Sequence, residues 1–399
     1  MKLSLVPSTV TIAPPERATP PGLPLSVMQT IDLAQRPIFI ERPPLFVYDP
    51  HETGLGGGLS HGWTADRTPL AFRTVFDARS IGQRLIVDSS GGIVLDDILR
   101  DEAACASQLA HFADRSSSLY HEDTDVQLIN GGYESDRLNT PHVFIDEPVI
   151  SLMSVEPSNY GSWLFRVLPK LLFLERIGNP DFKIACWAPH QWQQDLLAFF
   201  GVDPERIINI NLGICYHYRE IHVPVVINPV AYMGEDTLSF YRRTLENHGI
   251  EKKRERLIYI SRQTRAAAAG YVNVRHFVDE PQMVEAMRDI GFEIVEPEML
   301  SIVEQARLFS SAAMVVGASG AGMFNTAFCA PGTGIVDIEA FDSWLYAHCN
   351  YFSSCGHAYG IAFGKVDQDD HESWHKRWTI GVPGLVRKIQ HLRAAISDM

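Results

Sequence analysis

The sequence has no apolar run close to the roughly 20 residues that are needed to span a bilayer. Its first 25 residues hold six prolines, but no apolar core of the kind that a signal peptide carries. We therefore expect a cytoplasmic protein without a transmembrane segment. Peripheral association with a membrane, through a partner, stays open.

Basic residues are scarce as well. Lysine and arginine together number 34 against 48 aspartates and glutamates, which gives a formal net charge of −14. A diffuse acidic balance disfavours nonspecific binding to nucleic acid, so we expect no nucleic-acid partner. It does not exclude a small anionic ligand, because a few arginines and backbone amides can form a local positive site.

Motifs for metal binding and for hydrolytic nucleophiles are missing too. The chain has no HExxH, CxxC, GxxxxGK[ST] or GxSxG, and Asp123-Thr124-Asp125 falls outside the predicted α/β units. No metal ligand is therefore predicted. The six cysteines stand mostly in apolar segments, which predicts buried, reduced thiols in a reducing compartment.

The 399 residues, 46% of them hydrophobic, suffice for two domains with sizeable cores. From Asn159 onward, strand-like and helix-like segments alternate, which predicts α/β domains with parallel sheets covered on both faces. The predicted division is an extended proline-rich arm at 1–45, an N-terminal α/β domain at 46–234 with a β-rich region at about 70–100, a helix and linker at 235–256, a C-terminal domain at 257–375 and a helical segment at 376–399.

A glycine-rich turn follows a strand predicted at 314–316. Gly317 to Gly322 lead from this strand into a short helix, and ligands of open α/β sheets bind at the carboxyl ends of strands. Glycines let a phosphate approach the backbone, and a helix N-terminus offers free N–H groups. The spacing is GxxGxG rather than the dinucleotide GxGxxG, so a tight turn without a ligand is the alternative.

Further candidates lie in the same predicted domain. Ser261 and Arg262 end its first strand, where a guanidinium could hold a diphosphate. Ser301 and Glu304 have the spacing of a capping box, and the neighbouring Gln305 could bind a base or a sugar hydroxyl. Asp337, together with Glu339 on the last strand, could bind a ribose.

The first half contains one polar cluster before a strongly apolar helix. Glu156 lies in it, and Asn159, Tyr160, Ser162 and Trp163 follow. One interpretation is that Asn159 caps the helix. The other is that these residues lie across a cleft from the donor, on the acceptor side.

Taken together and in order, four motifs resemble glycosyltransferase family 61 over about residues 70–365. They are Asn159–Leu164 followed by Leu168–Leu171, Tyr259–Arg262, Pro297–Ser301 with Glu304-Gln305, and Gly317–Asn325 followed by Pro331-Gly332. The resemblance implies a GT-B fold, in which two Rossmann-like domains face an interdomain cleft, and inverting transfer without a metal. It also implies a nucleotide-sugar donor. Bacterial members of the family are often capsular polysaccharide biosynthesis proteins.

The sequence departs from the family pattern at three positions. Ser162 stands where the family usually has histidine, Arg166 where an acidic residue is common, and Ser319 where histidine is common in the glycine turn. If the missing histidine normally transfers the proton, another group does so here, or the chain is inactive.

These residues combine into one hypothesis. The diphosphate of a UDP-linked donor lies on Gly320, Ala321 and Gly322, and Ser319, Arg262 and Asn325 hold it, so that no cofactor or metal is needed. Glu156 is the first candidate for the base that activates a hydroxyl of a glycan or other acceptor. The rival hypotheses are a nucleotide-sugar epimerase of similar fold and a noncatalytic subunit of polysaccharide assembly.

Overall fold

The structure is a computed structural model of the α/β class, and the chain forms two compact units. One unit comprises Met1–Arg36 with Arg67–Pro229, and the other comprises Pro37–Asp66 with Val230–Met399. The residues described are 2–5, 26–32, 37–40, 43–59, 63–66, 70–82, 85–94, 126–129, 132–135, 138, 142–154, 158–225, 227–228, 231–263, 276–340, 344–368 and 377–397.

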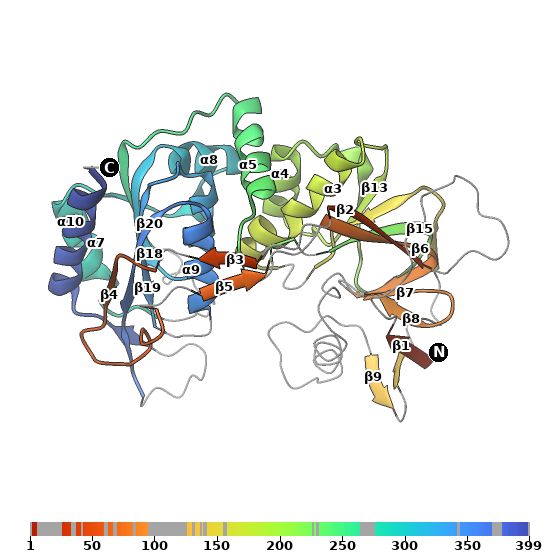
Figure 1. Cartoon of the computed structure of the whole chain (residues 1–399), viewed down its shortest axis with the longest axis horizontal. Helices are drawn as coiled ribbons and strands as arrows, with labels where there is room; N and C mark the ends of the chain where they lie inside the picture. The colour runs from red at the N-terminus through yellow and green to blue at the C-terminus, as the bar shows by residue number, and fades with distance from the viewer. Residues whose placement is uncertain are drawn as a thin grey trace. The chain divides into compact units, whose positions relative to one another are not determined.

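The first unit is built on a mixed sheet (Figure 1). Its strand order is β14-β13-β12-β15-β6-β7-β8-β1-β10-β9, with β11 paired to β15 and β2 paired to β6. The strands are β1 (Lys2–Leu5), β2 (Ser26–Asp32), β6 (Leu70–Ile81), β7 (Leu85–Val87), β8 (Gly92–Val94), β9 (Val126–Ile129), β10 (Gly132–Ser135), β11 (His142–Ile145), β12 (Val149–Ser151), β13 (Lys183–Cys186), β14 (Ile207–Asn209) and β15 (Cys215–Pro224). The predicted hairpin in the β-rich region is confirmed, because β7 and β8 pair antiparallel.

The apolar helix of the first unit is irregular because of one proline. Pro169 has no N–H to donate to the carbonyl of Phe165, and Nδ2 of Asn228 donates to that oxygen instead, at 2.9 Å. The Leu168 N–H reaches back to the Trp163 carbonyl, which makes a π-helical turn. The segment therefore runs as α2 (Tyr160–Ser162), the π-helix η2 (Trp163–Val167), the 3₁₀ helix η3 (Leu168–Lys170) and α3 (Leu171–Arg176). The helices α4 (Gln191–Phe199) and η4 (Pro204–Arg206) follow.

The second unit is built on a parallel sheet with the order β17-β16-β18-β19-β20-β4. These strands are β4 (Phe46–Tyr48), β16 (Arg256–Ile260), β17 (Glu293–Val295), β18 (Ala312–Ala318), β19 (Gly334–Glu339) and β20 (Ala358–Phe363). Two small antiparallel pairs join β3 (Pro37–Ile40) to β5 (Trp63–Asp66) and β21 (Lys365–Val366) to β22 (Trp378–Thr379). The helices are α5 (Glu235–Asn247), α7 (Glu280–Asp289), η6 (Pro297–Met299), α8 (Ile302–Ser310), η7 (Ala321–Phe328), α9 (Leu345–Ser354) and α10 (Val382–Ser397).

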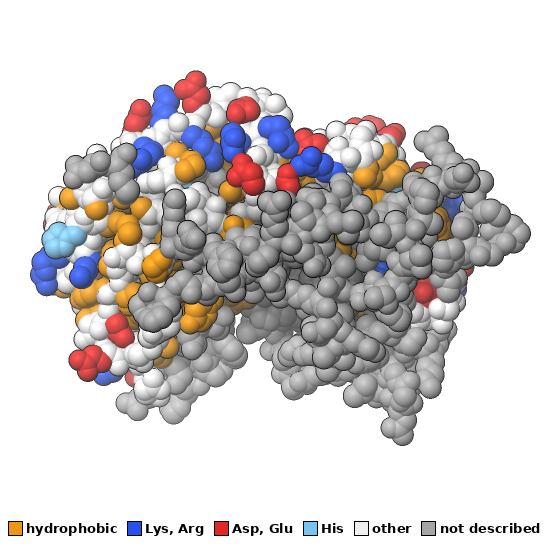
Figure 2. All heavy atoms as spheres, viewed as in Figure 1, with side chains coloured by type: hydrophobic (Ala, Val, Ile, Leu, Met, Phe, Trp, Pro, Cys, Tyr) orange, Lys and Arg blue, Asp and Glu red, His pale blue; other side chains and the backbone are white. Residues whose placement is uncertain are grey.

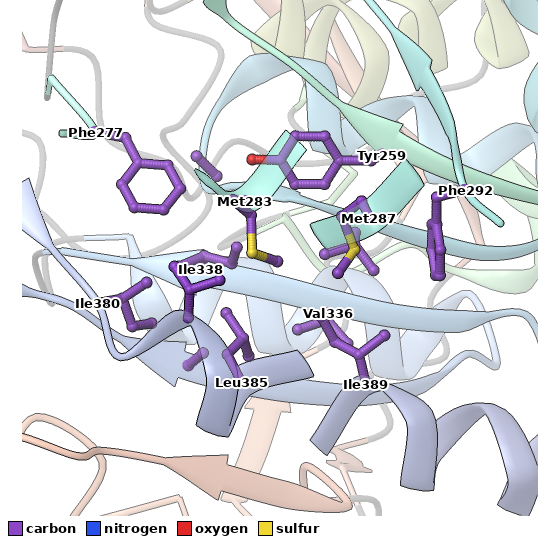
Figure 3. Close-up of a cluster of buried hydrophobic side chains, with 14 of the residues drawn as sticks. Tyr259, Phe277, Met283, Met287, Phe292, Val336, Ile338, Ile380, Leu385 and Ile389 are labelled. Carbon is purple, nitrogen blue, oxygen red and sulfur yellow. The ribbon is translucent and has the colours of Figure 1, made fainter. Parts of the chain in front are cut away.

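Side-chain alternation along β19 separates the hydrophobic core of this unit from its polar interior. Val336 and Ile338 point to one face, where α7 and α10 supply further buried apolar side chains (Figure 3). Because successive side chains of a strand point to opposite faces, Asp337 and Glu339 lie on the other face of the sheet. Both carboxylates are fully buried there.

The predicted domain boundaries need correction in the N-terminal part. Residues 37–66, assigned by sequence partly to the arm and partly to the N-terminal domain, belong to the second unit, because β4 pairs with β20 and extends its sheet. The hydroxyl of Tyr48 donates to the carbonyl of Gly381 at 2.9 Å and fixes this strand. Most of the described residues of the 1–45 segment form the strands β1, β2 and β3 rather than an extended arm, and β2, which is free of proline, pairs with β6.

Cysteines and surface charge follow the expectations from composition where they are described. Cys186, Cys215, Cys329, Cys349 and Cys355 are free and buried, and Cys105 lies outside the described residues. On the face drawn in Figure 2, acidic and basic side chains are interspersed.

In the described part of the chain, no helix combines the length and the apolar character that crossing a membrane requires.

A buried histidine makes the stability of the second unit depend on pH. Nε2 of His357 donates to the carbonyl of Thr326 in η7 at 2.9 Å, and burial lowers the pKa of His357 from 6.5 to about 4. The unfolded chain thus binds more protons than the folded chain between these two values. The contribution of neutral, buried His357 to the free energy of unfolding is therefore fully present above pH 6.5 and decreases as the pH falls towards 4.

We predict that the free energy of unfolding decreases less in His357→Gln than in the wild type when the pH is lowered. Glutamine can still donate to Thr326 but does not titrate, so the part of the acid loss that His357 causes, about 3 kcal/mol at most, should disappear. Urea unfolding at about pH 4.5 and about pH 7 measures this difference. Equal acid losses in the wild type and the variant would contradict it.

Candidate functional site

The order of the parallel strands locates a crevice in the second unit. From β16 the chain passes to β17 on one side and then to β18 on the other side, so the strand order reverses between β16 and β18. Ligands of open α/β sheets bind outside the carboxyl ends of the strands at such a point. Arg262 follows the carboxyl end of β16, and the glycine-rich turn follows that of β18.

The guanidinium of Arg262 lies against this turn. Its Nη2 donates to the carbonyl of Ala318 at 3.1 Å and also to the carbonyl of Ser319. The backbone N–H of Arg262 donates to Oε1 of Glu280 at 2.7 Å, and burial raises the pKa of this carboxyl. The structure therefore confirms that Arg262 and the glycine turn meet, although they are more than 50 residues apart in the sequence.

The backbone of the turn requires glycine at one position. Gly320 has φ 152° and ψ −169°, a region that glycine almost alone adopts, and a Cβ there would overlap Nη2 of Arg262. The first hydrogen bond of η7 runs from Met323 N–H to the Gly320 carbonyl. The N–H groups of Ala321 and Gly322 belong to the opening turn of this helix, where amides have no intrahelical acceptor. They are therefore suited to bind an anion.

Four of the predicted ligand residues are more than nine-tenths buried, and three of them, Ser319, Asn325 and Gln305, hold the turn and η7 through side-chain hydrogen bonds. Oγ of Ser319, predicted to face a diphosphate, donates to Glu339 and lies 3.0 Å from Nδ1 of His348. Asn325 Nδ2 donates to Oε1 of Gln305 at 3.1 Å, which ties η7 to α8. The fourth, Ser261, accepts a hydrogen bond from Gln263 N–H at 3.1 Å. Their predicted roles as direct ligand contacts stay predictions.

Asp337 belongs to the same buried cluster. Its Oδ2 lies 2.8 Å from Nδ1 of His348, and Glu339 Oε1 lies 3.4 Å from the same nitrogen. Since Asp337 and Ser319 both contact Nδ1, the histidine cannot relay a proton between them as it does in a hydrolase triad, which uses both ring nitrogens. Asp337 and Glu339 were both candidates from the sequence. His348 on α9 was missed, because no sequence motif links this helix to β19.

The same cluster has side-chain donor atoms of the kind that bind metal ions. Within the described ranges, Asp337, Glu339 and His348 are the group that could hold a metal ion, with ligand atoms within 4.8 Å of one another. Their contacts with Nδ1 lie at hydrogen-bond to ion-pair distances, but Oδ1 of Asp337 is buried without a hydrogen-bond partner, so a proton on Nδ1 leaves one carboxylate oxygen of the group unsatisfied.

The predicted capping box is confirmed. Oγ of Ser301 accepts from Glu304 N–H at 3.3 Å, and the carboxylate of Glu304 accepts from Ser301 N–H at 2.8 Å. These bonds to Ser301 overcome desolvation and lower the pKa of Glu304. Glu304 also borders an open groove of about 650 Å³ along the edge strand β17. The groove is lined by Arg256, Gln263, Arg288, Ile294, Val295, Glu296, Met299, Leu300, Glu304, Arg307 and Leu308.

The acceptor-side candidates lie in the first unit. Asn159 caps α2, since its Oδ1 accepts from the N–H groups of Gly161 and Ser162. Ser162 and Trp163 are each 1% exposed, whereas Tyr160 is half-buried. Glu156 lies outside the described residues.

Lys170 lies within the motif Leu168–Leu171, and no role was predicted for it from the sequence. Its side chain is fully buried, and Nζ donates to the carbonyl of Met153 at 2.6 Å, beyond the carboxyl end of β12. A buried ammonium is costly unless it is paired, so this contact fixes the chain just before the segment that contains Glu156.

We predict that two glycines of the turn differ sharply in their tolerance of a side chain. Gly320→Ala should lower the free energy of unfolding by about 1–3 kcal/mol, because alanine is strained at this φ. Gly322→Ala is the matched control, because its Cβ would meet only Ile260 Cγ2 at 3.6 Å. It should change stability by less than about 0.5 kcal/mol. Urea unfolding measures both, and equal losses would argue against this turn geometry.

Comparison with known proteins is consistent with this geometry. Residues 160–336 match the family model Glycosyltransferase 61, a segment that contains the irregular apolar helix, Arg262 and the glycine turn. No curated protein matches the chain at a significant level. The family match covers somewhat less than half of the chain, and over that segment it supports membership of glycosyltransferase family 61 and a glycosyltransferase activity.

Proposed function

We propose that the chain transfers a sugar from a UDP-linked donor to a hydroxyl group of a glycan or other acceptor. The observation that carries this proposal is the convergence of Arg262 with the turn at Gly320–Gly322, at the point where the strand order reverses. Glycine backbone, opening amides of a helix and one guanidinium are the groups that bind a diphosphate in proteins.

In the proposed reaction, the acceptor hydroxyl attacks the anomeric carbon in one displacement, and UDP leaves. This single step inverts the configuration at that carbon. Negative charge grows on the departing diphosphate, and the amides of Ala321 and Gly322 together with Arg262 stabilise it in place of a metal ion. Because these groups sit on a braced turn, little reorganisation is needed as the charge develops.

The proton of the acceptor hydroxyl needs a base. Ser162 is 1% exposed, and its Oγ lies 3.4 Å from Nη1 of Arg166, so this residue is a poor candidate. We propose Glu156, which follows the β12 segment that the Lys170–Met153 bond fixes. The burial of Ser162 and its contact with Arg166 also favour the second candidate function, a noncatalytic subunit that binds a nucleotide sugar.

The donor and acceptor sides are proposed to face each other in a GT-B arrangement. In support of this, each unit has its own set of parallel strands with a reversal of strand order, at β16/β18 in the second unit and at β12/β15 in the first. We further propose that the protein acts in the cytoplasm, in line with its free, buried thiols, and in bacterial capsular polysaccharide synthesis.

We predict that Arg262→Ala lowers the affinity for UDP by roughly 10- to 100-fold, the value of one or two charge-assisted hydrogen bonds. Arg393→Ala is the control, because it removes an equal charge from α10, where the guanidinium donates to the carbonyl of Ile290. Titration calorimetry measures the affinities, and circular dichroism checks the fold. Unchanged UDP affinity in Arg262→Ala would remove this residue from the site.

For Glu156→Gln, we predict a loss in kcat of roughly 10²- to 10⁴-fold with little change in UDP affinity, since a base acts on the acceptor and not on the nucleotide. UDP release in the presence of acceptor is the measurement. Full activity in this variant would exclude Glu156 as the base. Wild-type binding of UDP without turnover on any acceptor would instead favour the noncatalytic function.

A further inference from the structure

The first unit has its own reversal of strand order, next to β12. This strand pairs in parallel with β13 on one side and with β15 on the other. By the rule used above for the second unit, a ligand of this sheet lies outside the carboxyl ends of these strands. Trp187 directly follows the carboxyl end of β13, and α4 begins at Gln191 (Figure 1).

Aromatic rings from two segments meet at this place. The ring of Trp192 lies 5.6 Å from that of Tyr160 and 5.6 Å from that of Trp163, centroid to centroid. His190 lies nearly parallel to Trp192 at 6.4 Å and nearly perpendicular to Trp187 at 5.7 Å. Trp163 is buried and forms the base, whereas Tyr160, Trp187 and Trp192 are half-buried and His190 is exposed. We name these four, Tyr160, Trp187, His190 and Trp192, the aromatic platform.

The platform is held in place by hydrogen bonds of its loop. Oδ1 of Asn209 accepts from Ala188 N–H at 2.9 Å, and its Nδ2 donates to the Ala188 carbonyl at 3.1 Å. The fully buried Gln193 accepts from His190 N–H through Oε1 at 2.9 Å. A loop fixed by side-chain amides presents its rings with little entropy left to lose on binding.

The chemistry of the platform suits a neutral sugar ring. Indole, phenol and imidazole rings offer apolar faces for the C–H groups of a pyranose, and the phenol hydroxyl and the ring nitrogens offer hydrogen bonds at the rim. The five positions that form the platform and its base include no lysine, arginine or carboxylate, so no permanently charged group among them selects a charged ligand. The rings also adjoin Asn159, at the start of the helix predicted to lie on the acceptor side.

We propose that the aromatic platform binds a neutral pyranose ring of the acceptor glycan by stacking. This inference rests on the proposed glycosyltransferase function, and it adds Trp187, His190 and Trp192, which the sequence motifs did not mark, to the acceptor-side candidate Tyr160. Trp192 contacts both segments of the platform and is therefore its central residue.

The test uses the full chain and three neutral oligosaccharides: xylohexaose, cellohexaose and mannohexaose. Calorimetry should show that the wild type binds at least one of them and that Trp192→Ala weakens this binding roughly tenfold, whereas Trp192→Phe restores most of it. Phe144→Ala is the matched control, because Phe144 is an exposed aromatic residue of the same unit on β11, stacked edge-to-face with His217. It should bind the oligosaccharide like the wild type.

UDP affinity, measured on every variant, separates this inference from the proposed function. Wild-type protein that binds UDP but none of the hexaoses overturns the platform alone, and so does equal hexaose binding by Trp192→Ala. Wild-type protein that fails to bind UDP overturns the proposed function. If Trp192→Ala does not fold, His190→Ala replaces it, because His190 is exposed and its loss leaves the hydrogen bond between its backbone and Gln193 in place.

Discussion

The hydrogen bonds from Arg262 to the carbonyls of Ala318 and Ser319 connect the ends of two parallel strands, and the proposed donor site depends on them. Oγ of Ser319, in the same turn, contacts Glu339 and Nδ1 of His348. The turn is therefore held both by Arg262 and by this buried cluster. Gly320 is required because only a residue without Cβ allows the guanidinium to lie against this backbone. The amides that follow are thereby oriented before any ligand arrives, as electrostatic catalysis requires.

Local signals in the sequence predicted much of this unit. The alternation of strands and helices, the capping box at Ser301 and the turn after β18 all depend on neighbouring residues, and the structure confirms each of them. The encounter of Arg262 with the turn could also be predicted, because the carboxyl ends of parallel strands meet at one edge of a sheet. The bracing of Ser319 could not, since His348 reaches it from a separate helix.

Long-range pairing explains the other differences from the sequence-based expectation. Nothing local shows that β4 adds to β20 across more than 300 residues, so residues 37–66 were assigned to the wrong unit. Likewise, nothing near the apolar helix indicates that Asn228, 63 residues further along the chain, donates to the Phe165 carbonyl beside the π-helical turn. The aromatic platform was missed for the same reason, because Tyr160 and Trp192 meet only in the folded sheet.

The most direct test of the account is a crystal structure of the protein with UDP. We expect the diphosphate within hydrogen-bond distance of the amides of Ala321 and Gly322, with the guanidinium of Arg262 against its oxygens. UDP bound elsewhere, for example with its phosphates among the arginines along β17 and the glycine turn empty, would contradict the account.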